Sequence, residues 1–162
     1  AWELAVASLD RRSATDRLAL RKAATALHLA ELREGVWLRP DNLNRNRLPA
    51  LREILDQQCV HFHGAQTGIP AADVTSLFDL EDWAVDARRL TNAMRDEIDV
   101  EGGGADVFTY HFALSIAAVR HLELDPLLPV ELIPRQWPAH TLRSTYRRFD
   151  EVFKRRLNAA FR

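Results

Sequence analysis

The pattern of apolar and polar residues in the first part of the chain predicts short strands separated by helices. Residues 2–9 and 59–63 have the pattern of strands, and residues 30–39 indicate a hairpin that turns at Glu34-Gly35. Two helices are predicted between these strands, the first of which Ser13 or Thr15 can cap. Their core-facing residues are expected to be Leu18, Leu20, Ala24 and Leu27 in the first helix, and Leu48, Leu51, Ile54 and Leu55 in the second. This order predicts a ferredoxin-like βαββαβ unit over residues 1–70, with both helices covering one sheet face.

From residue 71 onward the apolar residues recur at helical spacing. A short helix begins at residue 73 and a longer one covers residues 81–98. The next, over residues 106–122, is the most apolar of the chain, and we expect it to lie buried in a helical core. The predicted class is therefore α+β, with a ferredoxin-like unit followed by a mainly α-helical C-terminal domain over residues 71–162.

The segment 125–138 connects two of these helices and is rich in proline. It holds four of the seven prolines of the chain, and proline disfavours helix both at its own position and at the residue before it. Because apolar residues lie between the prolines, we expect an ordered, extended strap packed on a surface. A helix with one apolar stripe follows, formed by Leu142, Tyr146, Phe149, Phe153 and Leu157.

Composition and charge narrow the classes of protein. The 162 residues have a net charge of −1 and a single cysteine, Cys59, which excludes an internal disulfide framework and suits a reducing cytoplasm. No apolar run approaches the roughly 18 residues of a membrane span. Residues 71–101 hold nine acidic and three basic side chains, a local net charge of −6. Residues 135–162 hold two acidic and eight basic side chains, a local net charge of +6. These are either two solvated helix faces that attract each other, or a basic helix that meets DNA phosphates or an acidic partner.

Several segments resemble the phenylacetic-acid catabolon repressor (PaaX-like) family of transcriptional regulators. LLPVELIPRQWP (127–138) followed by LRSTYRRF (142–149) is similar to the C-terminal region of that family, as is LFDLEDWAVDARRL (77–90). RLALRKAATALHLAELREGVWLRP (17–40) resembles its central ferredoxin-like domain, which is similar in fold to the small nucleases of CRISPR adaptation. Together these segments extend over nearly all of the chain.

The resemblance implies a function without catalysis. Such repressors bind operator DNA through an N-terminal winged helix-turn-helix and release it when an acyl-CoA binds, phenylacetyl-CoA in the founding case. Because nothing before Trp2 could supply that domain, we expect this chain to be the effector-binding and dimerisation portion of a cytoplasmic homodimer. No cofactor is expected. The sequence shows no nucleophile elbow and no phosphate-binding glycine loop, so we do not expect an enzyme.

An effector cleft is predicted between the two parts of the chain. Trp37 and Arg39 share one face of a strand, and the helical part contributes further aromatic and basic residues. The expected effector-binding set is Trp37, Arg39, Trp83, Arg88, Tyr110 and His111, in which arginines would meet the CoA phosphates. The alternative is that the two tryptophans are interdomain core and the arginines are rim residues.

Cys59, His61 and His63 alternate along a predicted strand and therefore point to one face. A thiolate and two imidazoles are suitable ligands for zinc or copper, with His111 or His28 as a fourth ligand, so a metal sensor is one alternative function. We instead expect the three residues to be structural, on the sheet face that the helices leave open.

Asp10 follows the first strand, where the related nucleases have a metal-binding acid. Phosphodiester cleavage would require paired carboxylates around a divalent cation, which makes a metal-dependent nuclease the other alternative. The same stretch is also typical of a strand-to-helix turn, with Asp16 near the positive end of the helix dipole.

Overall fold

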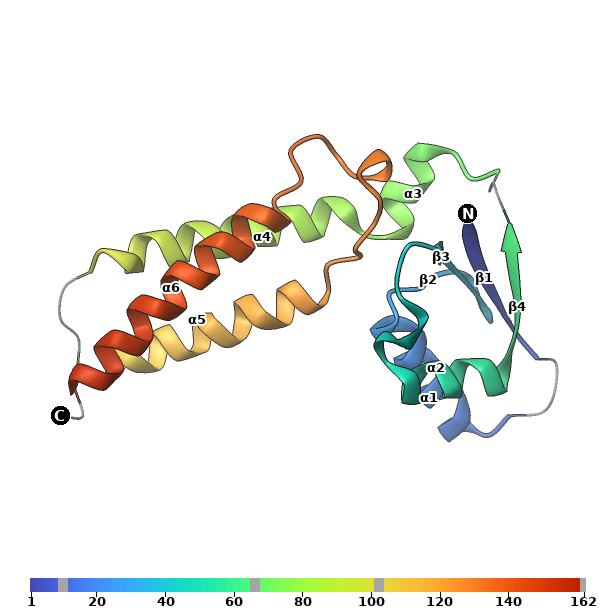
Figure 1. Cartoon of the computed structure of the whole chain (residues 1–162), viewed down its shortest axis with the longest axis horizontal. Coiled ribbons are helices and arrows are strands. Elements are labelled where there is room, and N and C mark those ends of the chain that lie inside the picture. The colour runs from blue at the N-terminus through green and yellow to red at the C-terminus, as the bar shows by residue number, and fades with distance from the viewer. Residues whose placement is uncertain (9–11, 65–67, 101–103, 161–162) are drawn as a thin grey trace. The chain divides into compact units, whose positions relative to one another are not determined.

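The computed structural model describes residues 1–8, 12–64, 68–100 and 104–160 (Figure 1). Contacts divide the chain into two compact units. The first comprises residues 1–79 and 126–133, and the second comprises residues 80–125 and 134–162. The sequence had suggested a boundary at residue 70, with the whole strap in the second part. The structure instead groups residues 71–79 and the middle of the strap with the first unit.

The first unit contains a four-stranded sheet with the strand order β2-β3-β1-β4, in which every neighbouring pair is antiparallel. Its strands are β1 (Trp2–Ala7), β2 (Ala30–Arg33), β3 (Val36–Pro40) and β4 (Cys59–Gly64). Its first helices are α1 (Ala14–Ala26), the 3-10 turn η1 (Arg45–Arg47) and α2 (Pro49–Gln58). The chain therefore mixes helices with an antiparallel sheet, and the predicted α+β class is confirmed.

Local sequence explains where these elements begin and turn. Ser13 caps α1: its hydroxyl accepts from the Asp16 backbone N–H at 3.0 Å, and the Asp16 carboxylate accepts from the Ser13 backbone N–H. Gly35 turns the hairpin between β2 and β3 with φ at +75°, a conformation that glycine adopts without strain. The turn predicted at Glu34-Gly35 is thereby confirmed.

Helices α1 and α2 lie together against one face of the sheet (Figure 1). The core that they enclose consists of Ala5, Leu20, Ala24, Leu27, Leu29, Trp37, Leu55 and Cys59. Leu18, which was also expected there, is 54% exposed, so that prediction was wrong. Its position in α1 is two residues from Leu20, which is about 200° around a helix and therefore on the opposite side.

The other face of the sheet is less completely covered. Leu4 of β1 lies opposite Leu38 of β3 and Phe62 of β4, so these three side chains share that face. Leu38 is buried, whereas Phe62 on the edge strand is 55% exposed. α3 (Ala71–Leu77) contacts β2 and the 3-10 turn η2 (Val130–Leu132). The middle of the strap is fixed by a hydrogen bond of 2.9 Å that the Asn42 side chain donates to the Leu127 carbonyl.

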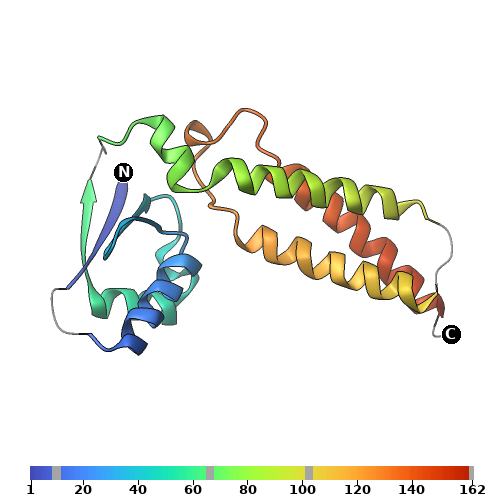
Figure 2. The same ribbon diagram turned by 180° about the vertical axis from the view of Figure 1, so that it is seen from behind.

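The second unit consists of three helices, α4 (Leu80–Ile98), α5 (Ala105–Glu123) and α6 (Ala139–Ala160), which lie side by side in both views (Figures 1 and 2). Its core consists of Trp83, Ala87, Met94, Ile98, Leu114, Ala118, Ala139, Leu142 and Phe149. The stripe predicted along α6 is confirmed, since Leu142, Phe149 and Phe153 are buried. Among the described residues, no helix combines the length and apolarity that crossing a membrane requires.

The prediction for α5 was wrong. The most apolar helix of the chain is not buried all round, because it fully buries only His111, Leu114 and Ala118. Phe112, in contrast, is 59% exposed. In a unit of three helices, each helix has two neighbours and one remaining side, and for α5 that side is apolar.

Two matched substitutions in α1 test this account of its faces. Leu20→Ala removes a side chain that is 1% exposed, and we expect the free energy of unfolding to fall by roughly 2–5 kcal/mol. Leu18→Ala, in the same helix, should change it by about 0.5 kcal/mol or less. Denaturant unfolding followed by tryptophan fluorescence measures both. Equal losses for the two variants would contradict the observed orientation of α1.

Candidate functional site

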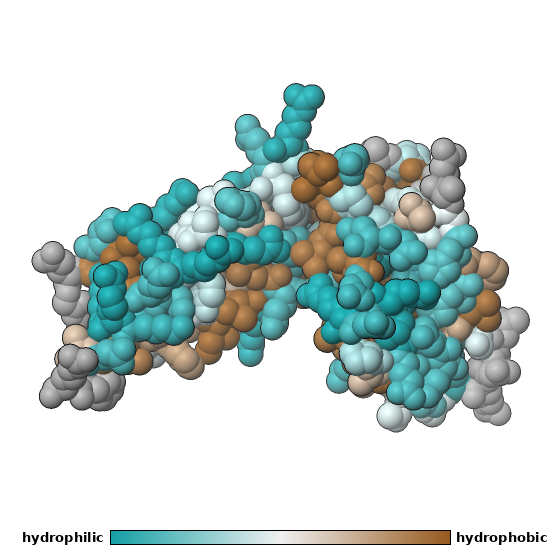
Figure 3. Space-filling view, in the orientation of Figure 1, coloured by the Kyte–Doolittle hydropathy of each residue, from teal (hydrophilic) through white to brown (hydrophobic). Residues whose placement is uncertain are grey.

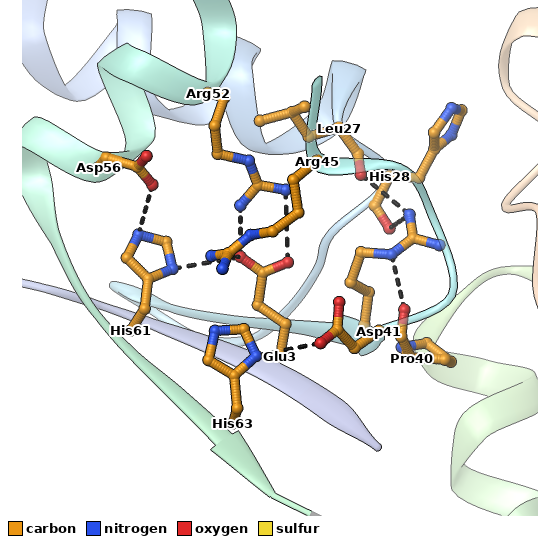
Figure 4. Close-up of polar contacts among 11 residues, drawn as sticks. Glu3, Leu27, His28, Pro40, Asp41, Arg45, Arg52, Asp56, His61 and His63 are labelled. Atoms are coloured by element: carbon orange, nitrogen blue, oxygen red, sulfur yellow. Dashed lines mark hydrogen bonds and ion pairs between the residues drawn. The ribbon is translucent and has the colours of Figure 1, made fainter. Parts of the chain in front are cut away.

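Two charged side chains lie between the sheet and its helices. Glu3 of β1 is directly opposite Arg39 of β3 in the strand register, so both point to the face that α1 and α2 cover. Their residues are only 1% and 2% exposed. Figure 4 shows Glu3 with Arg52, Arg45 and His61 around its carboxylate. Burying a charge is costly unless it is paired and hydrogen-bonded, so the partners of these two groups determine what the site can do.

The Glu3 carboxylate is surrounded by positive groups. Arg52 of α2 donates from Nη1 to Oε1 and, at 3.4 Å, from Nη2 to Oε2, an arrangement in which both carboxylate oxygens are engaged. Arg45 in η1 approaches the same carboxylate, with Nη2 3.8 Å from Oε1. The pair of Glu3 and Arg52 therefore connects the central strand of the sheet to α2.

His61 of β4 lies between two carboxylates. Its Nδ1 is 3.2 Å from Glu3 Oε1, and its Nε2 is 3.0 Å from Asp56 Oδ1. Neither ring nitrogen is aligned for a hydrogen bond with these oxygens. The ring therefore lies between the buried Glu3 and Asp56 of α2, whose side chain is 50% exposed. His63, further along β4, has its Nδ1 3.2 Å from Asp41 Oδ2.

Arg39 is held mainly by carbonyl oxygens. It donates from Nε to the Pro40 carbonyl at 2.9 Å and from Nη1 to the Leu27 and His28 carbonyls at 2.9 Å and 3.3 Å. Its Nη2 donates to the Asn42 side-chain oxygen at 2.9 Å. Burial lowers the pKa of Arg39 to about 10, because the charged form loses water. The Arg39 guanidinium therefore binds the end of α1. Its contacts do not support the expected role with a CoA phosphate.

The space beside these groups is small. A cavity of about 10 Å³ lies among Glu3, Arg39, Arg47 and Arg52, together with neighbouring residues of the loops. A single water molecule needs roughly 10–15 Å³. This cavity is therefore too small for a small-molecule ligand.

Cys59, His61 and His63 share one face of β4, as predicted, but that face was wrongly assigned. The register places them beside Ala7, Ala5 and Glu3, on the side that the helices cover and not on the open side. Burial raises the pKa of the Cys59 thiol to about 11, so the thiolate that metals bind forms less readily here than at an exposed cysteine. Within the described ranges, no group of three or more His, Cys, Asp or Glu residues is arranged to hold a metal ion.

The expected effector residues are divided between the two units. Trp37 belongs to the core of the first unit, with Arg39 beside it in the same strand. In the second unit, Trp83 is stacked between His121 and Trp137, with ring centroids 4.6 Å apart in both pairs. Its indole N–H donates to the His121 carbonyl at 3.1 Å. Trp83 therefore has the contacts of a core residue.

His111, which was also considered as a fourth metal ligand, is completely buried, and its Nε2 is 2.9 Å from Glu97 Oε2. Glu97 and Trp83 are fourteen residues apart in α4, or roughly 21 Å at 1.5 Å per residue, so Trp83 and His111 do not share one small cleft. Tyr110 and Arg88 are exposed. Asp10, the proposed nuclease residue, lies outside the described residues.

A groove in the second unit has features that the sequence did not reveal. It has a volume of about 800 Å³ and is lined by residues near the ends of α4 and α6: Ile98, Asp99, Arg148, Glu151, Val152, Arg155, Arg156 and Ala159. Arg148 Nη2 is 3.6 Å from Asp99 Oδ1, which supports the interpretation that the acidic and basic segments attract each other. Arg156 donates to the carbonyls of Glu97 and Ile98 at the end of α4.

A solved structure is similar to this chain, whereas the other comparisons find no match. No family model matches the sequence, and no curated protein matches it. A solved structure described as the uncharacterized protein Rv0674 from Mycobacterium tuberculosis is similar, with 31% sequence identity and a TM-score of 0.73. The match covers 98% of this chain and 62% of that one, so this chain spans less than two thirds of the length of its relative.

The buried carboxylate provides a prediction on stability. Glu3→Gln removes the negative charge that faces Arg52, whose side chain is 12% exposed, and also the charge that faces His61. Because positive groups are then buried without their partner, we expect a loss of roughly 3–5 kcal/mol in the free energy of unfolding. The matched control is Glu31→Gln, since Glu31 forms a more exposed pair with Arg21 at 4.0 Å. That control should lose about 1 kcal/mol or less, and similar losses would show that the cluster is not a buried charge network.

The Cys59 thiol provides a second prediction. Its pKa is raised from 9.0 to about 11, so we expect the native protein to react with thiol reagents at pH 8 far more slowly than the same protein in denaturant. The folded state also holds this proton more tightly than the unfolded state. The resulting contribution to stability is complete below pH 9 and is lost as the pH rises toward 11. Fast stoichiometric labelling of the native protein at neutral pH would refute this assignment.

Proposed function

We propose that the chain is the effector-binding and dimerisation portion of a bacterial, cytoplasmic PaaX-like transcriptional repressor, which releases operator DNA when an acyl-CoA binds. The observation that carries the proposal is the architecture of the first unit. Its βαββαβ order, its strand order β2-β3-β1-β4 and its two helices on one face support assigning it to the ferredoxin-like folds. That is the fold implied by the segments that resemble the family.

The path of the chain suits a regulator. It passes from the first unit to the second after residue 79, returns after residue 125 and leaves again after residue 133. The strap is held in the first unit by Asn42, which binds the Leu127 carbonyl and is itself held by Arg39. A ligand that favours one state of such a protein can couple to DNA binding by about 1–3 kcal/mol. Arg39 acts in this proposal as a positioning residue.

The groove between the ends of α4 and α6 is the place where the acyl-CoA would bind. Its volume of about 800 Å³ is within the range of small-molecule sites, which is roughly 300–1,000 Å³. Arg148 and Arg155 can meet phosphate groups, while Ile98, Val152 and Ala159 offer apolar contacts to the acyl portion. This groove replaces the set of residues expected from the sequence, of which Trp37, Trp83 and His111 are buried in the cores of their units.

Thermal shift and calorimetry with phenylacetyl-CoA test the proposal. A ligand at 100 times its Kd stabilises the folded state by about 2.7 kcal/mol, so the melting temperature should rise. Free CoA and phenylacetate, each of which lacks a part of the ester, should have smaller effects. Arg155→Glu reverses a charge in the groove, so we expect the Kd to rise by about tenfold or more. A tenfold change corresponds to about 1.4 kcal/mol of binding free energy. Arg89→Glu, an exposed arginine of α4 outside that lining, is the matched control.

Two results would overturn the proposal. The first is a series of aromatic and aliphatic acyl-CoA esters that leaves both the melting temperature and the tryptophan fluorescence unchanged. The second is magnesium- or manganese-dependent cleavage of DNA or RNA that Asp10→Ala abolishes, which would establish the nuclease instead. If phenylacetyl-CoA binds wild type and Arg155→Glu equally well, the function stands and the ligand site is elsewhere.

A further inference from the structure

Helix α5 presents an apolar stripe to solvent. Phe112, Ile116 and Val119 are 59%, 39% and 37% exposed, and their spacing of four and three residues places them on one side of the helix. Figure 3 shows apolar side chains gathered along the helical unit where Figure 1 places α5. On α4, by contrast, the exposed Val85 is surrounded in sequence by charged residues. A contiguous apolar stripe is typical of a surface that is covered by a partner.

The stripe has the heptad period of a helix–helix seam. It extends in steps of four and three residues through Ala105, Thr109, Phe112, Ile116, Val119 and Glu123, all of which are exposed. Such a period keeps one seam facing a partner helix along its whole length. The exposed charges of α5 are Asp106, Arg120 and Glu123, and they lie toward its two ends. The middle of the surface is therefore free of charge.

The charges beside the seam indicate which partner fits. Asp106 and Arg120 lie on the same flank of the stripe, each seven residues from Ala113. Two copies of α5 that pack antiparallel about a two-fold axis near Ala113 bring Asp106 of each copy beside Arg120 of the other. The midpoint between Phe112 and Ile116 is Leu114, one residue from that axis, so Phe112 of one copy comes close to Ile116 of the second. A parallel pair would align like charges at the same height, so the surface complements itself in the antiparallel direction only.

We propose that α5 is an interface through which two copies of this chain associate, with their α5 helices antiparallel and Phe112 and Ile116 at the centre. This inference names the surface for the dimerisation that belongs to the proposed function, and it needs neither the effector nor DNA. A C2 contact of this kind is isologous, so each favourable contact occurs twice.

The size of the interface determines the concentrations to be used. A helix of 19 residues is about 28 Å long and 10 Å wide, which corresponds to a footprint of roughly 300 Å². A standard stable interface buries about 800 Å² per partner. We therefore expect a reversible dimer whose dissociation constant is micromolar or weaker, and the whole chain should be measured by sedimentation equilibrium from low micromolar to sub-millimolar concentration.

Substitutions in the stripe test its role. Phe112→Glu places a charge at the centre of the seam, and we expect the dimer dissociation constant to rise by at least about tenfold. Val85→Glu is the matched control, because Val85 is equally exposed, at 58%, but belongs to α4. It should leave association unchanged. Circular dichroism verifies that both variants are folded. A wild type that stays monomeric throughout, or a dimer that Phe112→Glu does not weaken, would overturn the proposal.

The antiparallel direction has its own test. Asp106→Arg and Arg120→Asp should each weaken the dimer, because each brings like charges together, whereas the double variant should restore it. A double variant that is no better than the single variants would overturn the antiparallel register. This outcome is independent of the acyl-CoA titration, so the failure of the interface and the failure of the proposed function are distinguishable.

Discussion

The burial of the Arg39 guanidinium is the constraint on which the arrangement of the first unit depends. A charge beneath two helices is tolerated only where oxygen atoms replace its water, and Arg39 finds them on the carbonyls of Leu27, His28 and Pro40 and on the Asn42 side chain. These contacts fix the end of α1 against β3. Through Asn42 they also hold the strap at Leu127, so one side chain determines the position of a helix end, a loop and a distant segment.

Glu3 adds a second constraint on the same sheet face. Its carboxylate has Arg52, Arg45 and His61 within 3.8 Å, so a shift of one residue in the β1–β4 register would turn His61 away and leave Glu3 without that partner. A buried ion pair contributes little net stability compared with an apolar pair of similar size, but breaking it is strongly destabilising. The main effect of the network is therefore to favour one strand register, and its net contribution to the stability of the unit is small.

Periodicity predicted most helices and strands, including the hairpin at Glu34-Gly35 and the stripe on α6. Such elements are determined by residues that are close together in the sequence. The charge cluster could not be found in this way, since Glu3 and Arg52 are 49 positions apart and meet only through the packing of α2 on the sheet. One signal was present: Glu3 is the only charged residue in a strand of apolar residues, and at a period of two it shares a face with Ala5. The face of Cys59, His61 and His63 was wrongly assigned because alternation shows which residues share a face but not which face the helices cover.

The misassignment of α5 has a different origin, and it bears on the proposed interface. A segment rich in apolar residues is expected to be buried, but a helix in a unit of three has only two neighbours to cover it. His111, Leu114 and Ala118 occupy the covered side, and the apolar residues of the other side remain in water within one copy of the chain. An apolar surface at heptad spacing with complementary charges toward its ends is typical of a surface that a partner covers. The apolar residues that wrongly predicted a buried helix are therefore the surface that we propose as an interface, and a contact between two copies about a two-fold axis has the isologous symmetry that this surface allows.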